Sequence, residues 1–317
     1  MALFDVFNGD ADGLCALQQI RLAEPADSTL VTGVKRDIAL LRRVEAGAGD
    51  RVTVLDVSLD KNREPLLGLL ERGVAVRYFD HHFPGEIPRH PGLDVHIETL
   101  PDKGTSLLVD EYLAGRFRTW AVVGSFGDNF DDTARRAAEP LGLDETALGR
   151  LRELGIYLNY NGYGAAVEDL HIAPDALFRR LHPYADPLEF IATDATFGQL
   201  EASYREDMAK AQALRPELES ERHGLYLLPA QPWARRVGGV LANRLAQVAP
   251  GRAHALLTRL PDGGFVVSVR APLQRKEGAD TLCRSFPSGG GRKAAAGINR
   301  LPDELYDTFV KAFTEAF

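Results

Sequence analysis

The sequence predicts an α/β protein, in which a doubly wound, mainly parallel sheet domain is followed by a smaller α/β domain. Apolar runs of strand length alternate with helical segments in the first two hundred residues, and several of these runs end in a carboxylate. The remaining hundred residues differ in charge and in strand spacing. Because ligands bind outside the carboxyl ends of parallel strands, we expect the active site at that edge, in the cleft between the two domains.

The first domain is predicted to cover residues 1–187. Strands are predicted at residues 3–7, 28–34, 51–56, 74–79 and 120–126, and helices at residues 14–22, 38–44, 62–72, 103–113 and 131–157. The segment 157–164 is rich in aromatic and amide side chains and is predicted as a loop. Its rings could stack on a base, or they could pack beneath the connection between the domains.

A connecting helix and linker are predicted at residues 188–219, because residues 189–214 contain few helix breakers and Pro216 follows them. The second domain is predicted at residues 220–317. Its expected strands are residues 224–228, 253–258 and 265–270, with a hairpin turn at 261–264, and its expected helices are residues 237–248, 279–283 and 303–317.

Composition and charge limit the function. With 45% apolar and 26% charged residues in a chain of 317, the composition is that of an ordinary globular protein of about two domains. We find no apolar run of membrane-spanning length and no signal peptide, so we expect a cytoplasmic protein. The net charge of -8 divides into -14 over residues 1–219 and +6 over residues 220–317, which fits a metal-binding domain beside a phosphate-binding domain. The whole chain is too acidic for binding long duplex DNA.

The stretch Asn8-Gly9-Asp10-Ala11-Asp12-Gly13 joins the first strand to the first helix. Two carboxylates at this spacing repel each other, and a divalent cation between them would offset the repulsion. An alternative is a polar loop in which Asp12 caps the helix.

Further carboxylates favour the metal. Asp56 ends a predicted strand, Asp80 and Asp128 come after predicted strands, and Asp80 begins the sequence Asp80-His81-His82. Asp10, Asp12, Asp56, His81 and Asp128 therefore form a candidate ligand set of four carboxylates and one imidazole. This set suits manganese or magnesium better than zinc. Five ligands exceed the needs of one ion, so we expect two divalent ions, with Asp56 bridging them and Mn²⁺ favoured over Mg²⁺.

These motifs resemble the DHH phosphoesterase superfamily. The resemblance rests on the Asn8 to Gly13 stretch, Asp56, Asp80-His81-His82 and Asp128, in this order, and on the stretch from Ser288 to Gly297 with Val267 to Arg270 before it. The second part is similar to the C-terminal domain associated with DHH proteins. The superfamily branch includes RecJ-like exonucleases, nano-RNases and cyclic-dinucleotide phosphodiesterases.

The resemblance implies a role for each site residue. One ion would be held by Asp10 and Asp56, with Asn8 where an acidic or histidine ligand is usual. The other ion would be held by Asp12, Asp56, His81 and Asp128. His82 would face the substrate phosphate or the leaving oxygen, and Asp80 would fix the orientation of His81.

The substrate would be held by the second domain, through Arg270, Gly289, Gly290, Gly291, Arg292 and Lys293. We expect the glycines to present backbone N–H groups to a phosphate at a helix start. Arg292 stands where the family usually has histidine, and it would add a permanent bidentate phosphate contact. Lys293 could equally be a solvated helix residue.

We therefore predict a metal-dependent phosphodiesterase that cuts very short single-stranded RNA or DNA, or a dinucleotide, to mononucleotides. One alternative is a phosphomonoesterase or pyrophosphatase acting on a small metabolite such as phosphoadenosine phosphate. Another is a nucleotide-binding sensor without turnover, suggested by Asn8 and Arg292. No membrane partner is expected, and a homodimer is left open.

Overall fold

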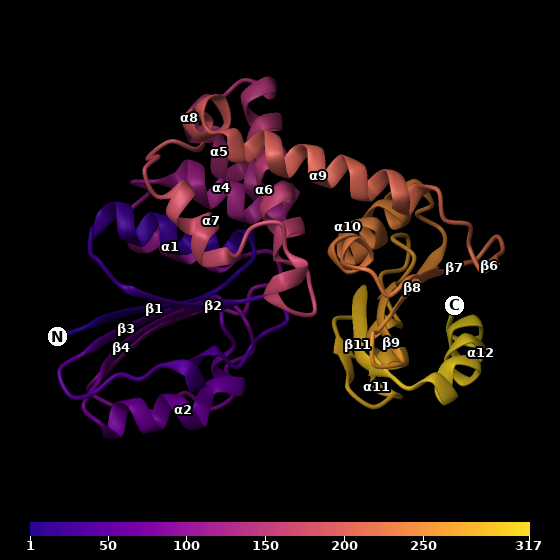
Figure 1. Ribbon diagram of the computed structural model, residues 1–317, viewed down its shortest axis with the longest axis horizontal. Helices are drawn as coiled ribbons and strands as arrows, with labels where there is room; N and C mark the ends of the chain where they lie inside the picture. Colours follow the sequence, from indigo (N-terminus) through magenta and orange to yellow (C-terminus); the bar gives the residue numbers. More distant parts are fainter. The chain divides into compact units, whose positions relative to one another are not determined.

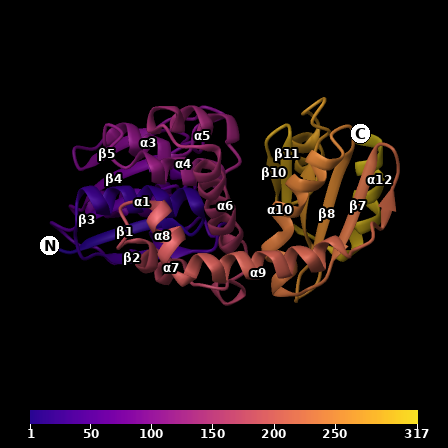
Figure 2. The ribbon, with the colours of Figure 1, turned by 90° about the horizontal axis from the view of Figure 1, so that it is seen from above.

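The computed structural model describes residues 1–317, which form two compact units, Met1–Ala202 and Ser203–Phe317. The first unit contains a five-stranded sheet in which every neighbouring pair is parallel. The strands lie in the order β2-β1-β3-β4-β5, which can be followed in Figure 2. Their bounds are β1 Leu3–Asn8, β2 Thr29–Gly33, β3 Arg51–Leu55, β4 Ala75–Asp80 and β5 Leu93–Ile97.

The strand order creates a switch point between β1 and β3. The chain leaves β1 toward β2 on one side and later returns to β3 on the other side of β1. At such a point the two connections diverge and leave a crevice outside the carboxyl ends of the strands. The residues that follow β1 and β3 therefore lie on either side of this crevice.

Helices cover both faces of the sheet. Figure 1 shows α2 (Leu59–Glu71) on one face and α1 (Ala11–Ala23) on the other. On the α2 face, Val6, Val54 and Tyr78 pack with leucines of α2 and of the 3-10 helix η1 (Leu40–Arg43) in one buried cluster. The sheet is thus buried on both faces, which is why its strands are nearly continuous apolar runs. The predicted doubly wound α/β fold is confirmed.

The rest of the first unit is helical. Its further elements are α3 Thr105–Tyr112, α4 Arg118–Gly127, α5 Asp131–Ala138, η2 Glu139–Leu141, α6 Glu145–Gly162, η3 Val167–Asp169, α7 Pro174–Leu181, α8 Pro187–Thr193 and the start of α9 Ala195–Gln212. The long helix expected at residues 189–214 is therefore two helices. No helix in the structure combines the length and the apolar character that crossing a membrane requires.

The strand expected at residues 120–126 is wrong, because these residues lie within α4. A short apolar run is the same in a buried strand and in a buried helix, so periodicity could not distinguish the two. Glycines explain how closely this helix packs. A Cβ on Gly124 would lie 2.4 Å from Ser106 Oγ, and one on Gly127 would lie 2.2 Å from Ala11 Cβ. The missing side chains let α4 pack closely against its neighbours.

Two smaller expectations also fail, and one strand was missed. Residues 157–162 continue α6 instead of forming a loop, with Tyr157, Tyr160 and Asn161 buried. The helix expected at residues 38–44 is a single 3-10 turn. Strand β5 was not predicted, since it is a partly exposed edge strand whose apolar pattern is short.

The second unit contains a six-stranded mixed sheet in the order β10-β11-β9-β8-β7-β6, in which the β7–β8 pair is parallel and the others are antiparallel. Its three predicted strands, its hairpin turn and its three helices are confirmed. The elements are β6 Leu218–Glu219, β7 His223–Leu228, α10 Pro232–Val248, β8 Ala253–Arg259, β9 Phe265–Arg270, α11 Ala279–Arg284, β10 Gly289–Gly291, β11 Ala295–Leu301, η4 Asp303–Leu305 and α12 Tyr306–Ala316.

A buried ion pair ties α1 to β1. Arg21 donates from Nε and Nη2 to the two carboxylate oxygens of Asp5, both at 2.7 Å, and Asp5 is fully buried. Removing the cation would leave an unpaired buried carboxylate.

We expect Arg21→Met to lower the free energy of unfolding by about 3–5 kcal/mol, measured by urea denaturation. The double variant Asp5→Leu/Arg21→Met should recover most of this loss. A loss below about 1 kcal/mol for the single variant would contradict the prediction.

Candidate metal centre

The turn from β1 into α1 carries the first two carboxylates of the site. Asp10 is the N-cap of α1, and its Oδ1 accepts a hydrogen bond from the Gly13 N–H at 3.0 Å. The capping role considered for Asp12 therefore belongs to Asp10. A Cβ on Gly13 would lie 2.2 Å from the Asn8 carbonyl oxygen, so the turn can be this tight only with glycine at that position.

Asp12 is fully buried and accepts two backbone hydrogen bonds at the start of α3. The Thr105 N–H donates to its Oδ2 at 2.6 Å and the Ser106 N–H donates to its Oδ1 at 2.9 Å. A helix N-terminus offers unpaired N–H groups and a partial positive charge, so it stabilises a carboxylate there. This contact holds Asp12 in place at the site.

Asp56 follows β3 and has a backbone φ of 57°, in the left-handed region. Asp tolerates this region better than most residues, yet the conformation costs about 1–3 kcal/mol. The Asp56 N–H donates to the Phe79 carbonyl at 3.0 Å, and Thr105 Oγ1 donates to Asp56 Oδ1 at 3.2 Å. The strained turn thus directs a buried carboxylate toward the neighbouring strand end.

The Asp80-His81-His82 motif lies at the carboxyl end of β4. Asp80 Oδ1 accepts from the His81 backbone N–H at 2.9 Å and lies 2.7 Å from His82 Nδ1. The ring of His81 is held differently, with Nδ1 at 3.0 Å from the carbonyl oxygen of Lys103. Asp80 therefore orients the ring of His82, not that of His81 as the family resemblance implied. The side chain of His82 is 47% exposed, so a substrate can reach it.

The ring of His81 directs its Nε2 into the carboxylate cluster. This atom lies 3.4 Å from Asp56 Oδ1 and 3.8 Å from Asp128 Oδ2. Because the Lys103 carbonyl must accept a proton from Nδ1, the hydrogen bond fixes which nitrogen is available to a ligand. Ligand atoms of Asp12, His81 and Asp128 all lie within 4.8 Å of one another, as do those of Asp56, His81 and His82.

Asp128 reaches the site from the carboxyl end of α4, where it is the C-cap, and not from a strand. Its Oδ1 is 2.8 Å from Lys35 Nζ, and the same ammonium pairs with Asp10 Oδ2 and lies 2.9 Å from Asn159 Oδ1. Lys35 follows β2, so it comes from the same edge of the sheet as the other site residues.

The electrostatics of the site follow from this arrangement. Burial, and then the charge of Asp128, raises the pKa of Asp12 to about 6. Burial and the charges of Asp10 and Asp12 raise the pKa of Asp56 well above its ordinary value. Burial by itself would raise the pKa of Asp128, but Lys35 and His81 hold it below the usual range.

At the basic side chains, the neighbouring carboxylates outweigh burial and raise the pKa. Burial lowers the pKa of His81, yet its hydrogen bond and charge interactions with Asp56 outweigh burial and raise the pKa to about 10. Burial likewise lowers the pKa of His82, but Asp80 raises it above the ordinary histidine value. Asp10 and Asp128 outweigh burial at Lys35 and raise its pKa well above normal. The carboxylates therefore keep nearby protons on the basic side chains.

Asn8 is the last residue of β1 and is 6% exposed. Its Nδ2 donates to the Lys35 carbonyl at 3.3 Å, and its Oδ1 is buried without a hydrogen-bond partner. A buried carbonyl oxygen without a partner is costly. Asn8 thus offers one free oxygen at this edge of the sheet, but no charge.

Of the predicted metal residues, the structure groups Asp12, Asp56, His81 and Asp128 at ligand distances, whereas Asn8 and Asp10 lie outside these groups. It also adds groups that the sequence reasoning missed. These are Lys35, Asn159, the N–H groups of Thr105 and Ser106, and the carbonyl of Lys103. Lys35 carried a signal, since it comes directly after a strand predicted to end at this edge. The others depend on how α3 and α6 pack, which no local pattern specifies.

The predicted substrate residues lie in the second unit. Arg270 ends β9 and donates from Nε to Asn243 Oδ1 at 2.7 Å. The glycines do not start a helix as expected, because Gly289–Gly291 form strand β10, which pairs with β11. Arg292 and Lys293 follow in the hairpin turn and are exposed.

The glycines of β10 have different neighbours. A Cβ on Gly289 would lie 1.7 Å from the Cys283 carbonyl oxygen, and one on Gly291 would lie 2.5 Å from Ala296 Cα. A Cβ on Gly290 would meet nothing within 4 Å. Packing therefore explains Gly289 and Gly291, whereas Gly290 has open space beside its Cα.

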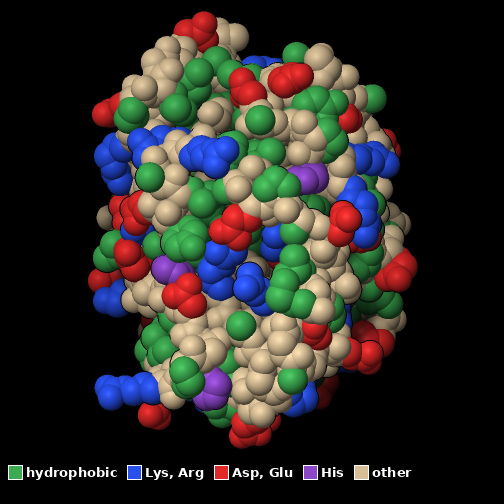
Figure 3. Space-filling model, turned by 90° about the vertical axis from the view of Figure 1, so that its left-hand side faces the viewer, with side chains coloured by type: hydrophobic (Ala, Val, Ile, Leu, Met, Phe, Trp, Pro, Cys, Tyr) green, Lys and Arg blue, Asp and Glu red, His purple; other side chains and the backbone are tan.

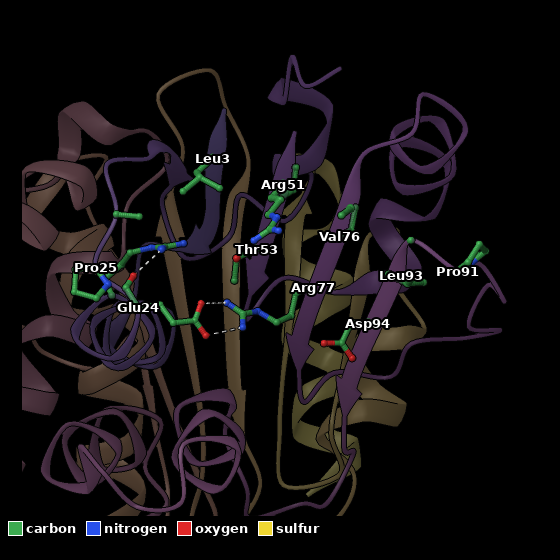
Figure 4. Close-up of a pocket in the computed structure, with 15 residues that line it drawn as sticks. Leu3, Glu24, Pro25, Arg51, Thr53, Val76, Arg77, Pro91, Leu93 and Asp94 are labelled. Atoms are coloured by element: carbon green, nitrogen blue, oxygen red, sulfur yellow. Dashed lines mark hydrogen bonds and ion pairs between the residues drawn. The ribbon is translucent and has the colours of Figure 1, made fainter. Parts of the chain in front are cut away.

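A hollow of about 590 Å³ lies at the opposite edge of the first sheet, at the amino ends of the strands (Figure 4). Its prominent cation, Arg77, is paired with both carboxylate oxygens of Glu24, at 2.9 and 2.8 Å. Figure 3 shows that basic and acidic side chains are mixed over the face seen from that side of the molecule. This hollow lacks the converging carboxylates of the other edge, so we place the functional site at the carboxyl ends.

No family model matches the sequence, and no curated protein matches it. Solved structures match it along nearly its whole length. An exonuclease RecJ bound to manganese has a TM-score of 0.64 and 21% identity, over 100% of this chain and 90% of that chain. A DHH domain from a protein described as a member of a family of ribosomal proteins has a TM-score of 0.68 and 12% identity, over 99% of this chain and 86% of that chain.

A pGpG-specific phosphodiesterase from Vibrio cholerae has a TM-score of 0.53 and 15% identity, over 99% of this chain and 98% of that chain. At these identities the likeness concerns the fold. The resemblance that the ordered motifs indicated therefore holds for the fold, which this chain shares with the RecJ and DHH-domain structures.

Proposed function

We propose that this protein is a metal-dependent phosphoester hydrolase that cuts very short oligonucleotides or dinucleotides to mononucleotides. The observation that carries the proposal is the position of His81 Nε2, between Asp56 and Asp128 and beside Asp12. Its other ring nitrogen is held by a backbone carbonyl, which is the usual arrangement of a metal-binding histidine.

The residues at this position fit a divalent ion. Asp12, Asp56 and Asp128 offer carboxylate oxygens, and His81 offers one nitrogen, a mixture suited to Mn²⁺ or Mg²⁺. Burial and neighbouring carboxylates raise the pKa values of Asp12 and Asp56, and the positive charge of an ion would favour their ionised forms. When bound, such an ion lowers the pKa of water and stabilises the charge that develops on a phosphoryl group.

His82 is proposed to serve the leaving group. Its ring is partly exposed, and Asp80 holds its Nδ1, so the opposite nitrogen can face the substrate. The raised pKa favours the protonated ring. His82 can therefore donate a proton to the leaving oxygen, and Asp80 stabilises the charged ring until it does.

The second unit is proposed to bind a phosphate of the substrate. Arg270, Arg292 and Lys293 supply positive charge, and strand β10 supplies backbone groups at Gly289, Gly290 and Gly291. Gly290 supports the proposal most directly, because the space where a side chain would stand is open and a ligand can come close to the strand there. A guanidinium binds a phosphate through charge-assisted hydrogen bonds, and a strand without side chains on that side lets the phosphate come close to it.

Two of the similar structures favour a nucleotide substrate, since one is described as an exonuclease and another as a pGpG-specific phosphodiesterase.

The test is a substrate panel with the purified full chain and Mn²⁺. We expect release of mononucleotides from pGpG and from di- to pentanucleotides, with slower hydrolysis of phosphoadenosine phosphate, pyrophosphate and polyphosphate. Faster hydrolysis of one of these small phosphates would assign the phosphomonoesterase or pyrophosphatase alternative. Nucleotide binding without hydrolysis would indicate a sensor.

The same assay tests the site. Asp12→Asn should lower kcat by at least about 100-fold, because it removes a charge that holds the ion. Asp27→Asn is the matched control, since Asp27 is exposed between α1 and β2, and its activity should equal that of the wild type. Equal activity of both variants would contradict the proposed site.

Substrate binding by the second unit can be separated from the chemistry. Arg292→Ala should raise KM about tenfold with little change in kcat, because one charge-assisted phosphate contact is lost. Gly290→Ala should also raise KM, since the added methyl group blocks the approach to the backbone while the fold has room for it. Arg275→Ala, another exposed arginine of this unit, is the control. Unchanged KM in both test variants would contradict phosphate binding here.

Metal binding should release protons, and more at pH 6 than at pH 8. With a pKa of about 10, His81 carries an Nε2 proton at both pH values and must lose it to bind an ion. Asp12, with a pKa of about 6, is half protonated at pH 6 and ionised at pH 8. The difference should be about half a proton or more, measured by calorimetry of Mn²⁺ binding in buffers of different ionisation enthalpy. Equal release at both pH values would contradict the prediction.

A further inference from the structure

The ammonium of Lys35 lies among three oxygen atoms that belong to separate elements. It pairs with Asp10 Oδ2 at the start of α1, with Asp128 Oδ1 at the end of α4 at 2.8 Å, and with Asn159 Oδ1 of α6 at 2.9 Å. An ammonium has three N–H donors, so these contacts use all of them. Lys35 therefore has no donor left for a substrate in this arrangement.

The backbone of Lys35 is also held at both ends. Its N–H donates to the Gly162 carbonyl at 2.8 Å, and its carbonyl accepts from Asn8 Nδ2 at 3.3 Å. The ammonium lies 5.6 Å from the ring centroid of Tyr163. Since the side chain is 23% exposed, it is anchored among these partners instead of extending into solvent.

The family resemblance assigns Asn8, Asp10 and Asp56 to the first of two ions. This set does not suit a divalent cation beside the Lys35 ammonium. Asn8 is neutral, so Asp10 and Asp56 would provide the only negative charges of that set. Asp10 Oδ1 is bound to the Gly13 N–H and Oδ2 to Lys35. Asp10 also lies outside both groups of side chains that could hold a metal ion. A cation placed there would meet a fixed positive charge and an already neutralised carboxylate.

We propose that the Lys35 ammonium takes the place of one of the two divalent ions, so that the site binds a single ion, on Asp12, Asp56, His81 and Asp128. Asparagine at position 8 fits this arrangement, because a monovalent ammonium needs one carboxylate fewer than a divalent ion. Lys35 is then a positioning residue. It bridges the carboxylates of Asp10 and Asp128 and leaves the second oxygen of Asp128 facing His81.

This inference rests on the proposed metal-dependent function, and the number of bound ions tests it without any substrate. Mn²⁺ is titrated into the metal-free full chain, the bound metal is counted by elemental analysis, and the spectrum is recorded by electron paramagnetic resonance. We expect one ion per chain and the six-line spectrum of an isolated Mn²⁺. Two ions with an exchange-coupled spectrum would overturn the inference but not the proposed function. Absence of any bound ion would contradict both.

Variants identify the residue responsible. Asn8→Asp/Lys35→Met restores a charged ligand and removes the ammonium, and we expect it to bind two ions with a coupled spectrum. Lys35→Arg keeps the positive charge and should still bind one. Lys61→Met, which removes an exposed lysine of α2, is the matched control and should also bind one. A single ion in the double variant would overturn the inference.

One further variant keeps the test decisive if the double variant does not fold, which circular dichroism will show. Asn8→Asp retains Lys35, so it adds a ligand without removing the ammonium. We expect it to bind one ion, as the wild type does. Two ions in Asn8→Asp would show that the neutral residue at position 8, and not the ammonium, limits the site, and would overturn the inference.

Discussion

Repulsion between buried carboxylates is the constraint on which the first unit depends. Asp10, Asp12, Asp56 and Asp128 converge at one edge of the sheet, and they are 12% exposed or less. Charges of the same sign cannot be buried together unless positive charge or hydrogen-bond donors compensate them. Each unusual feature of this edge supplies part of that compensation.

The compensation comes from three sources. Backbone N–H groups at the start of α3 bind Asp12, the ammonium of Lys35 binds Asp10 and Asp128, and the ring of His81 lies between Asp56 and Asp128. The first two are fixed parts of the fold. The proton on His81 Nε2 can be displaced, so this is the position at which an ion can enter without disturbing the packing around it.

Strain and packing serve the same arrangement. Asp56 adopts a left-handed backbone conformation, and the residue after Asp128, Asn129, does so as well. The turn at Asp56 directs its own carboxylate toward the site, and the turn at Asn129 directs that of Asp128. The packed core must offset the energetic cost of these conformations. The close contact of α4 with α1 at Gly127 brings Asp128, the next residue, to the same edge. Stability and site geometry are therefore coupled in this unit.

The sequence by itself determined the alternation of strands and helices, and with it the parallel sheet. It also determined the edge at which Asp10, Asp56 and His81 lie, because side chains that follow parallel strands gather at one edge. It could not determine that residues 120–126 form a helix, since a short apolar run satisfies both structures. Only the tertiary structure placed Lys35 between Asp10 and Asp128, because that contact joins elements distant in the chain. Ligand types are local properties of a sequence, whereas the charge that balances them depends on packing.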